Sequence, residues 1–256
     1  KVCEKLVPFM AGFYIIGCII ILFLNGSYVL PALKLIVSSA FTPKAAGGGF
    51  IGSTVMMAIR FGIARGLFTN EAGLGSAPIV DAAASTRNPV RQGLIAMTGV
   101  FWDTVIVCAL TGLVLVSSIL RNPDGMSGLS GGALSSAAFA NIPVVGPIVL
   151  TVGLICFAWS TILGWSYYGE RCWVYLCGQK AIMPFRIIYT LVVFVGSVMT
   201  LDAVWGIADI LNASMAFPNL VALLGLSGVI ASETKKYLFD DNMDGWSDDE
   251  IPVVDK

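Results

Sequence analysis

The chain has 256 residues, of which 57% are hydrophobic and 12% are charged, and its mean hydropathy is +0.85. These values exclude an ordinary water-soluble domain and indicate an integral membrane protein. A formal net charge of −1 without a basic cluster gives no electrostatic basis for binding nucleic acid. The sequence has no histidine, which removes the commonest zinc ligand and every histidine-dependent catalytic triad, so we do not expect an enzyme.

Five membrane crossings are predicted from runs that carry little or no charge. A helix needs about 20 apolar residues to cross the bilayer. Four runs are long enough, and they lie between Lys5 and Lys34, Arg91 and Arg121, Asp124 and Glu170, and Asp209 and Glu233. A fifth, near residues 181–201, contains Arg186 close to one end, where a long side chain reaches the headgroups. Asp103 is the one charged residue within the second run, which makes it a functional candidate.

A sixth crossing is needed between Pro31 and Arg91 to keep the alternation of sides, and two placements compete. A crossing at residues 52–85 would put four charged side chains in the bilayer, namely Arg60, Arg65, Glu71 and Asp81. Each costs about 2.5–3.5 kcal/mol unless it is paired or hydrated. A crossing at residues 31–64 leaves only Lys44 deep in the membrane. We prefer the second placement.

The distribution of Lys and Arg predicts the orientation. With the first helix running outward, the inner side holds twelve of these residues and the outer side holds Lys34, Lys44 and Arg121, as the positive-inside rule requires. We therefore expect both ends of the chain in the cytoplasm. Residues 1–237 form the predicted transmembrane segment, and residues 238–256 form a disordered acidic tail. Because the chain begins without Met, we interpret it as part of a longer protein.

The stretch AAGGGFIGSTV, residues 45–55, interrupts an apolar run with three consecutive glycines. Irregular backbone at membrane depth is tolerated where it is buried or lines a watery cavity, and interrupted helices bind ions and zwitterions in many transporters. The candidate substrate-binding residues here are Gly48, Gly49, Phe50 and Ser53. The alternative is that the glycines only allow two helices to pack closely.

The stretch RGLFTNEAGLGSAPI, residues 65–79, brings polar groups and three glycines into the apolar chain. Ser76 and Pro78 predict the start of a helix. The preferred topology puts the stretch at or just beneath the cytoplasmic surface, where Asn70 and Glu71 are candidate gate residues. A solvated loop followed by a capped helix is the alternative.

The stretch FAWSTILGWSYYGE, residues 157–170, puts Thr161 and Trp165 four residues apart, on one face of a helix. A hydroxyl for a cation or an amine and an aromatic wall for a small side chain would both be supplied there, with Ser160 beside them. The alternative is that these hydroxyl groups bond to carbonyls of their own helix and that the aromatic rings lie in the interfacial belt.

These three stretches, together with RQGLIAMTGVFWDT and IADILNASMAFPNL, resemble the alanine or glycine:cation symporter family of prokaryotes. The resemblance covers residues 7–237 and corresponds to the C-terminal half of such a transporter. It implies an all-α integral membrane protein with about six transmembrane helices. These would form the second inverted repeat of a LeuT-type fold, with one broken helix, and one preceding helix. The N-terminal half, which supplies many substrate and sodium contacts in that fold, would be missing.

The resemblance implies sodium-coupled symport of alanine or glycine by alternating access in the prokaryotic cell (inner) membrane, without a cofactor and with Na⁺ as coupling ion. Phe50 or Phe68 would meet the substrate, Thr161 and Trp165 would line its side-chain pocket, and Ser160 or Thr161 would help hold sodium. The expected partners are a small neutral amino acid, sodium, the lipid bilayer and the missing N-terminal half. The alternatives are another LeuT-type amino-acid or cation carrier, or a half-length membrane fragment that does not transport.

Overall fold

The computed structural model describes residues 2–41, 62, 65–129, 131–240, 243 and 245, and within them every regular element is a helix. Five helices are long and apolar enough to cross a membrane: Val2–Leu24, Pro89–Arg121, Val145–Cys177, Gln179–Val198 and Leu201–Gly225. Each overlaps one of the five runs that the sequence predicts, although Leu201–Gly225 begins before Asp209 and Val145–Cys177 extends beyond Glu170. An all-α, multi-pass membrane protein is therefore confirmed. Most of the predicted sixth crossing, including the glycine-rich interruption, lies outside the described residues.

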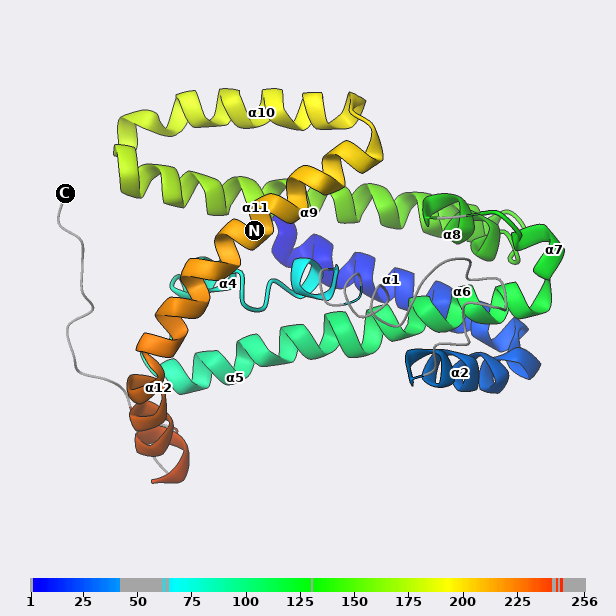
Figure 1. The fold of residues 1–256 in the computed structure, drawn as a ribbon, viewed down its shortest axis with the longest axis horizontal. Coiled ribbons are helices and arrows are strands. Elements are labelled where there is room, and N and C mark those ends of the chain that lie inside the picture. The colour runs from blue at the N-terminus through cyan, green and yellow to red at the C-terminus, as the bar shows by residue number, and fades with distance from the viewer. Residues whose placement is uncertain are drawn as a thin grey trace. The chain divides into compact units, whose positions relative to one another are not determined.

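The elements follow one another along the chain as Figure 1 labels them. Their bounds are α1 Val2–Leu24, α2 Gly26–Phe41, α4 Ala77–Asp81, α5 Pro89–Val100, η2 Phe101–Cys108, α6 Ala109–Arg121, α7 Pro123–Met126, α8 Gly131–Phe139, α9 Val145–Cys177, η3 Gln179–Ala181, α10 Ile182–Val198, α11 Leu201–Gly225, α12 Ser227–Thr234 and η4 Lys235–Phe239. The span Pro89–Arg121 is thus α5, the π-helical η2 and α6 in succession. Two compact units divide these elements. The first comprises residues 1–65 and 102–163, and the second comprises residues 66–101 and 164–256.

The first unit has an apolar core. Ile21 of α1, Val114 of α6 and Phe139 of α8 are each at most 1% exposed, and Val149 of α9 packs with them. A Cβ atom at Gly17 would lie 2.7 Å from Val149 Cγ1, so the glycine is what lets α1 and α9 pack closely here. Lipid tails are as apolar as these side chains, so close packing between the helices, rather than removal from water, stabilises the unit.

A buried polar cluster ties the first unit together beside this core. Asn25, the residue between α1 and α2, is 1% exposed. Its Nδ2 donates to Ser117 Oγ and Ser118 Oγ at 3.2 and 3.1 Å, and its Oδ1 accepts from Arg121 Nη1 at 2.8 Å. Asn141 Nδ2 also donates to Ser118 Oγ, at 3.2 Å. Both polar atoms of the Asn25 side chain are therefore hydrogen-bonded to side chains of α6.

In the second unit, the end of α9 and α10 form a helical hairpin (Figure 1). Gly178, with φ +79°, makes the turn in a left-handed conformation that glycine adopts without strain. Arg186 Nε donates to Glu170 Oε2 at 2.7 Å, and Arg186 Nη2 donates to Glu170 Oε1 at 3.3 Å. Arg186, expected to reach the headgroups, is thus held across the hairpin in a two-point ion pair.

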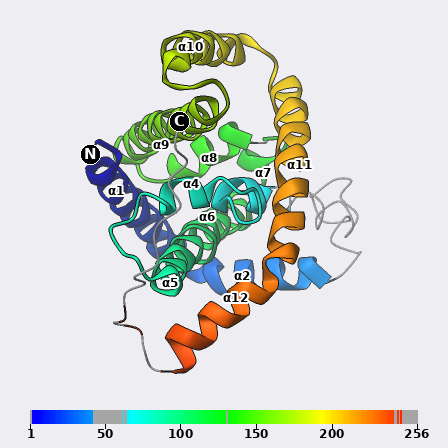
Figure 2. The same ribbon diagram turned by 90° about the vertical axis from the view of Figure 1, so that its left-hand side faces the viewer.

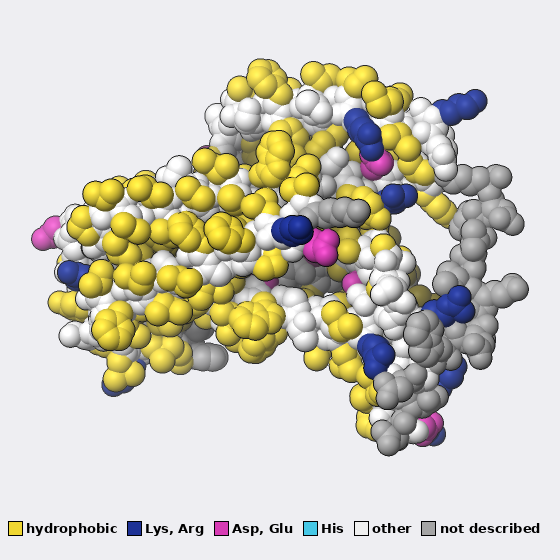
Figure 3. Space-filling view, turned by 180° about the vertical axis from the view of Figure 1, so that it is seen from behind, with side chains coloured by type: hydrophobic (Ala, Val, Ile, Leu, Met, Phe, Trp, Pro, Cys, Tyr) yellow, Lys and Arg dark blue, Asp and Glu magenta, His cyan; other side chains and the backbone are white. Residues whose placement is uncertain are grey.

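The long helix α11 is followed directly by α12 (Figure 2). Pro218 lies inside α11, where its missing N–H leaves the carbonyl of Ser214 without its usual partner. Large hydrophobic side chains of α10 and α11 are exposed, including Phe194, Phe217 and Leu224, and hydrophobic side chains dominate the face drawn in Figure 3. Helices that are apolar all round are typical of membrane spans.

Candidate functional site

The polar stretch at residues 65–81 begins with a helix and continues through a left-handed turn. Residues 65–70 are helical, and α4 starts at Ala77. Between them the backbone is left-handed at Glu71, Gly73 and Gly75, with φ +56°, +85° and +79°. Asn70 Oδ1 accepts a hydrogen bond from the Ala72 amide at 2.9 Å, which supports the start of the turn. A non-glycine residue in this region costs about 1–2 kcal/mol, so the conformation at Glu71 depends on its surroundings.

An aromatic cluster joins this stretch to two membrane helices of the second unit. The ring of Phe68 stacks on Trp165 of α9, with centroids 6.3 Å apart and planes 13° apart. Phe68 also meets Trp205 of α11 edge to face at 5.7 Å, and Trp165 meets Tyr168 edge to face at 5.6 Å. Offset-stacked and edge-to-face pairs each add about 0.5–1.5 kcal/mol beyond burial. Phe68 and Trp165, which the sequence analysis names separately, are therefore direct neighbours.

The side chain of Glu71 is half-buried, and its carboxyl group lies near the hydroxyl groups of Ser76 and Tyr168. Burial raises the pKa of Glu71 above its ordinary value of 4.5, while the nearby hydroxyls of Ser76 and Tyr168 oppose the rise. Ser76 is 1% exposed, and its Oγ has no partner within hydrogen-bond geometry among the described residues. Its effect on Glu71 is thus one of proximity rather than of a formed hydrogen bond. Ser76 precedes α4, as predicted, but its side chain does not cap that helix.

Helix α11 holds the turn through Asn219. Asn219 Nδ2 donates to the carbonyl oxygen of Gly73 at 3.0 Å. The same side chain lies against Gly75, where an added Cβ atom would be 3.0 Å from Asn219 Oδ1. The turn therefore contacts α11 through Asn219 and lies close to α9, where the Tyr168 hydroxyl is near the Glu71 carboxyl group.

The remaining predicted site residues do not belong to this cluster of contacts. Ser160 Oγ donates to the carbonyl of Phe157 in its own helix at 3.0 Å and lies 3.8 Å from Met10 Sδ. Thr161 is exposed on α9, one turn before Trp165. Gly48, Gly49, Phe50 and Ser53 lie outside the described residues. Within the part of the chain that is described, no three His, Cys, Asp or Glu side chains converge on a point that could hold a metal ion.

Asp103 is placed in the π-helical segment η2. Its Oδ2 atom is buried and has no hydrogen-bond partner among the residues that the structure describes. Single π-helical turns inside longer helices occur frequently at functional sites, and ionisable side chains within membrane spans are functional candidates. Asp103 thus stays a candidate from both the sequence and the structure.

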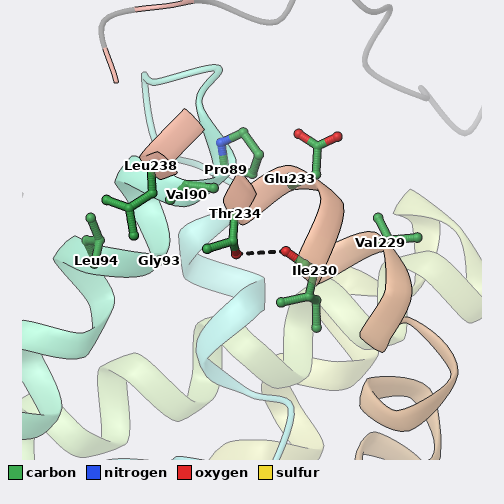
Figure 4. A pocket seen from close by; sticks show the side chains of 9 residues that line it. All are labelled: Pro89, Val90, Gly93, Leu94, Val229, Ile230, Glu233, Thr234 and Leu238. Carbon is green, nitrogen blue, oxygen red and sulfur yellow. Dashed lines mark hydrogen bonds between the residues drawn. The ribbon is translucent and has the colours of Figure 1, made fainter. Parts of the chain in front are cut away.

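An apolar pocket of about 370 Å³ lies between α5, α12 and η4 (Figure 4). The hydroxyl of Thr234 donates to the Ile230 carbonyl at 2.7 Å, and the Glu233 side chain points away from the apolar lining. The Thr234 hydroxyl is thus bonded within its own helix, and the rest of the lining that faces the pocket is apolar. The polar cluster around residues 68–76 is therefore the better candidate for the functional site.

Three residues of the cluster were missed by the sequence analysis: Tyr168, Trp205 and Asn219. Tyr168 follows Trp165 by three positions, so the helical spacing indicates that both face the same side. Asn219 is an amide within the apolar run of α11 and directly follows Pro218. A polar residue within a membrane-spanning run is a functional candidate, and this signal could have identified Asn219 from the sequence.

The chain thus combines apolar helices of membrane length with a half-buried polar turn, and transporters build their sites from irregular polar backbone held among membrane helices. A family model described as the sodium:alanine symporter family matches residues 1–249. The chain is 50% identical over 237 residues to the sodium/alanine symporter AgcS of Methanococcus maripaludis, covering 93% of this chain and 51% of that protein. It is also 50% identical over 249 residues to an uncharacterized transporter of Haemophilus influenzae, covering 96% and 54%.

A third relative is the probable sodium/glutamine symporter GlnT of Bacillus subtilis, which is 34% identical over 239 residues, covering 93% of this chain and 48% of that protein. The chain belongs to the sodium:alanine symporter family. This is a family of transporters rather than of enzymes, as the sequence predicts. The chain spans about half the length of the curated relatives it matches.

Proposed function

We propose that this chain is one half of a symporter that carries a small neutral amino acid, alanine or glycine, into the cell together with Na⁺. Family membership and the 50% identity to a sodium/alanine symporter support this proposal. Transport proceeds by alternating access, in which the amino acid and the ion bind together from one side and are released on the other. We propose that the family has a LeuT-type fold. In that fold, this chain would form the second inverted repeat together with one preceding helix.

The stacking of Phe68 on Trp165 is the observation that carries the assignment of the site. It joins the polar stretch proposed as the gate directly to the helix face proposed as the side-chain pocket. In this proposal Thr161 and Trp165 form the pocket wall on α9. Gly48, Gly49, Phe50 and Ser53 supply further contacts from the glycine-rich interruption, and the N-terminal half supplies the rest.

The proposed sodium contacts are the hydroxyl oxygens of Ser160 and Thr161. Ser160 donates its proton to a carbonyl of its own helix, which leaves the lone pairs of Oγ available for a cation. Sodium rather than a proton is the proposed coupling ion. No covalent chemistry is required, because the ion gradient supplies the free energy.

Asn70 and Glu71 are the proposed inner-gate residues. Glu71 contacts hydroxyl groups of the turn and of α9, so the substitution Glu71→Gln should alter the transport rate more than the equilibrium affinity for the amino acid. The comparison is the maximal rate and the binding constant of the complete transporter with and without the substitution. A large loss of affinity at an unchanged rate would move this residue from the gate to the binding site.

Reconstitution tests the function. The complete transporter that contains this chain is expected to accumulate alanine or glycine in proteoliposomes under an inward sodium gradient, and not under a proton gradient alone. The 256-residue chain by itself is expected to be inactive, because one repeat lacks its partner and half of the site. Uptake driven by a proton gradient would contradict the sodium assignment, and uptake by the chain alone would contradict the half-site proposal.

The proposed location is the prokaryotic cell membrane, with both ends of the chain in the cytoplasm. Single cysteines introduced at each end and treated with an impermeant reagent test this orientation. They should react in inside-out vesicles and stay unlabelled in intact cells. Labelling from outside intact cells would contradict the topology.

A further inference from the structure

Asn219 contacts the turn at residues 71–76 in two ways that depend on its exact shape. Its Nδ2 donates to the Gly73 carbonyl at 3.0 Å. Its Cβ, Cγ and Oδ1 atoms lie within 3.3 Å of the position that a Cβ atom at Gly75 would take. The Asn219 side chain thus packs directly on the backbone at Gly75, where any larger residue would collide with it.

The turn needs such an external contact because its own conformation is unfavourable. Glu71 is left-handed without being glycine, and Ser76 buries a hydroxyl that lacks a hydrogen-bond partner among the described residues. Backbone in sparsely populated regions persists only where the surroundings hold it, and such sites gather at clamps and switches. The hydrogen bond from Asn219 stabilises the turn against relaxation of these groups.

Helix α11 carries a proline directly beside Asn219. Pro218 immediately precedes it and removes the hydrogen bond to the Ser214 carbonyl. Sharp bends in helices occur mostly at such prolines. A bend at Pro218 would displace Asn219 relative to Trp205, which contacts Phe68 from the same helix. Such a bend would change one of the two contacts of α11 with residues 68–75 without the other.

We propose that Asn219 is the positioning residue of the inner gate: its hydrogen bond to Gly73 keeps the turn at residues 71–76 closed against α11, and its loss releases the turn toward the cytoplasm. This inference rests on the proposed transport function. It adds a residue of α11 to the gate, and it assigns the gate movement to a bend at Pro218.

Accessibility of Ser76 tests the proposal in the complete transporter. In a cysteine-free background, the substitution Ser76→Cys puts a single thiol at a position that is 1% exposed. In inside-out vesicles, adding Asn219→Ala should raise the labelling rate about 2- to 10-fold, the range that corresponds to one net hydrogen bond. Asn219→Gln keeps an amide donor and should restore part of the protection.

Ser214→Ala is the matched control. Ser214 is an exposed residue of the same helix, and its hydroxyl donates to the Ile210 carbonyl of that helix. This substitution should leave the labelling rate unchanged. An unchanged rate for Asn219→Ala, or an equal rise for Ser214→Ala, would overturn the proposal. The melting temperature of Asn219→Ala should stay close to that of the parent. A large drop together with labelling at every buried position would indicate a purely structural role and would also overturn it.

A second measurement keeps the test valid if Ser76→Cys does not fold. Hydrogen exchange of the amides at residues 72–76 in the otherwise native transporter should accelerate in Asn219→Ala and not in Ser214→Ala. Alanine uptake in the same vesicles separates the two proposals. Faster labelling or exchange without any sodium-driven uptake would support the role of Asn219 in holding the turn and would contradict the transport function. Normal uptake with unchanged labelling and exchange would contradict the role of Asn219 and support the transport function.

Discussion

Two regions that bury polar groups, one around Asn25 in the first unit and one around Glu71 in the second, differ in how far their hydrogen bonds are satisfied. Asn25 uses both ends of its amide, with three side-chain partners on α6 at 2.8–3.2 Å. Around Glu71 the backbone is left-handed, a carboxyl group is half-buried, and the Ser76 hydroxyl lacks a hydrogen bond among the described residues.

We interpret the difference as one between a structural polar cluster and the proposed functional one. A fully satisfied buried cluster stabilises a single arrangement, whereas an incompletely satisfied one leaves a second arrangement close in free energy. Departures from local consistency gather at functional sites in natural proteins. The region around Glu71 therefore fits an element that changes conformation, and the region around Asn25 fits one that does not.

The largest expected effect on stability comes from Asn25→Ala. The substitution removes hydrogen bonds to Ser117, Ser118 and Arg121, so buried partners lose their bonds at about 1–3 kcal/mol. Thermal unfolding of the complete transporter in detergent measures this. Asn25→Asp keeps the acceptor for Arg121 and should destabilise less than Asn25→Ala. Equal stability of Asn25→Ala and the parent would remove the contrast between the two regions.

A smaller loss is expected from Asn88→Ala at the start of α5. Asn88 Oδ1 accepts from the amides of Val90 and Arg91 at 3.1 and 3.0 Å, and an N-cap of this kind contributes about 1 kcal/mol. Asn88 Nδ2 also donates to the carbonyl of Met243 at 3.0 Å. Proteolysis after residue 240 should therefore become faster as well. Unchanged cleavage would show that the contact does not hold the tail.

A still smaller effect is expected in the pH dependence of stability. Because burial raises the pKa of Glu71 above 4.5, the folded state binds the proton more tightly than the unfolded state. The resulting stabilisation is fully present below pH 4.5 and is lost as the pH rises through the raised value. Glu71→Gln should remove this decline, whereas Asp124→Asn, at an exposed carboxylate of α7, should not. A parent transporter whose stability rises over this range would contradict the prediction.

The smallest effect is expected from Ser76→Ala. The hydroxyl is buried without a hydrogen-bond partner among the described residues, so its removal costs no bond and should leave the melting temperature unchanged or slightly raised. Comparison with Asn25→Ala makes the contrast direct, because both remove a buried polar group. A loss at Ser76 as large as at Asn25 would mean that this hydroxyl is satisfied in the native protein.

The sequence predicted the spans well because charge-free length is a strong signal in membranes. Each of the five runs with little or no charge overlaps a helix of membrane length. The helix beginning at Ala77 was also predicted, from Ser76 and Pro78. The cap itself was not formed, because tertiary burial places the Ser76 side chain elsewhere.

The contacts between segments could not be read from the sequence. Phe68 and Trp165 were each singled out, but 97 positions separate them and no local periodicity reports their stacking. Asn219 and Gly73 are 146 positions apart, and their hydrogen bond depends on a left-handed turn that composition alone does not specify. Ser160 shows the opposite case, since its bond to its own helix was the expected alternative and was found.

The most direct test of the account is substrate competition in the complete transporter carrying Trp165→Ala. If Trp165 closes a pocket just large enough for a methyl group, alanine should bind more weakly while valine and leucine gain. One methylene in such a pocket is worth about 1–3 kcal/mol, or roughly 10- to 200-fold in selectivity. Thr161→Val should weaken binding without admitting larger substrates, because it deletes a hydroxyl at constant shape.

The matched control is Trp173→Ala on the same helix, where the indole packs on Phe185 with centroids 6.1 Å apart. The measurement compares the affinities for glycine, alanine, valine and leucine in the parent and the three variants. We predict that only Trp165→Ala changes their order, in favour of valine and leucine. An unchanged order in Trp165→Ala would make Trp165 a packing residue and would contradict the placement of the side-chain pocket on α9.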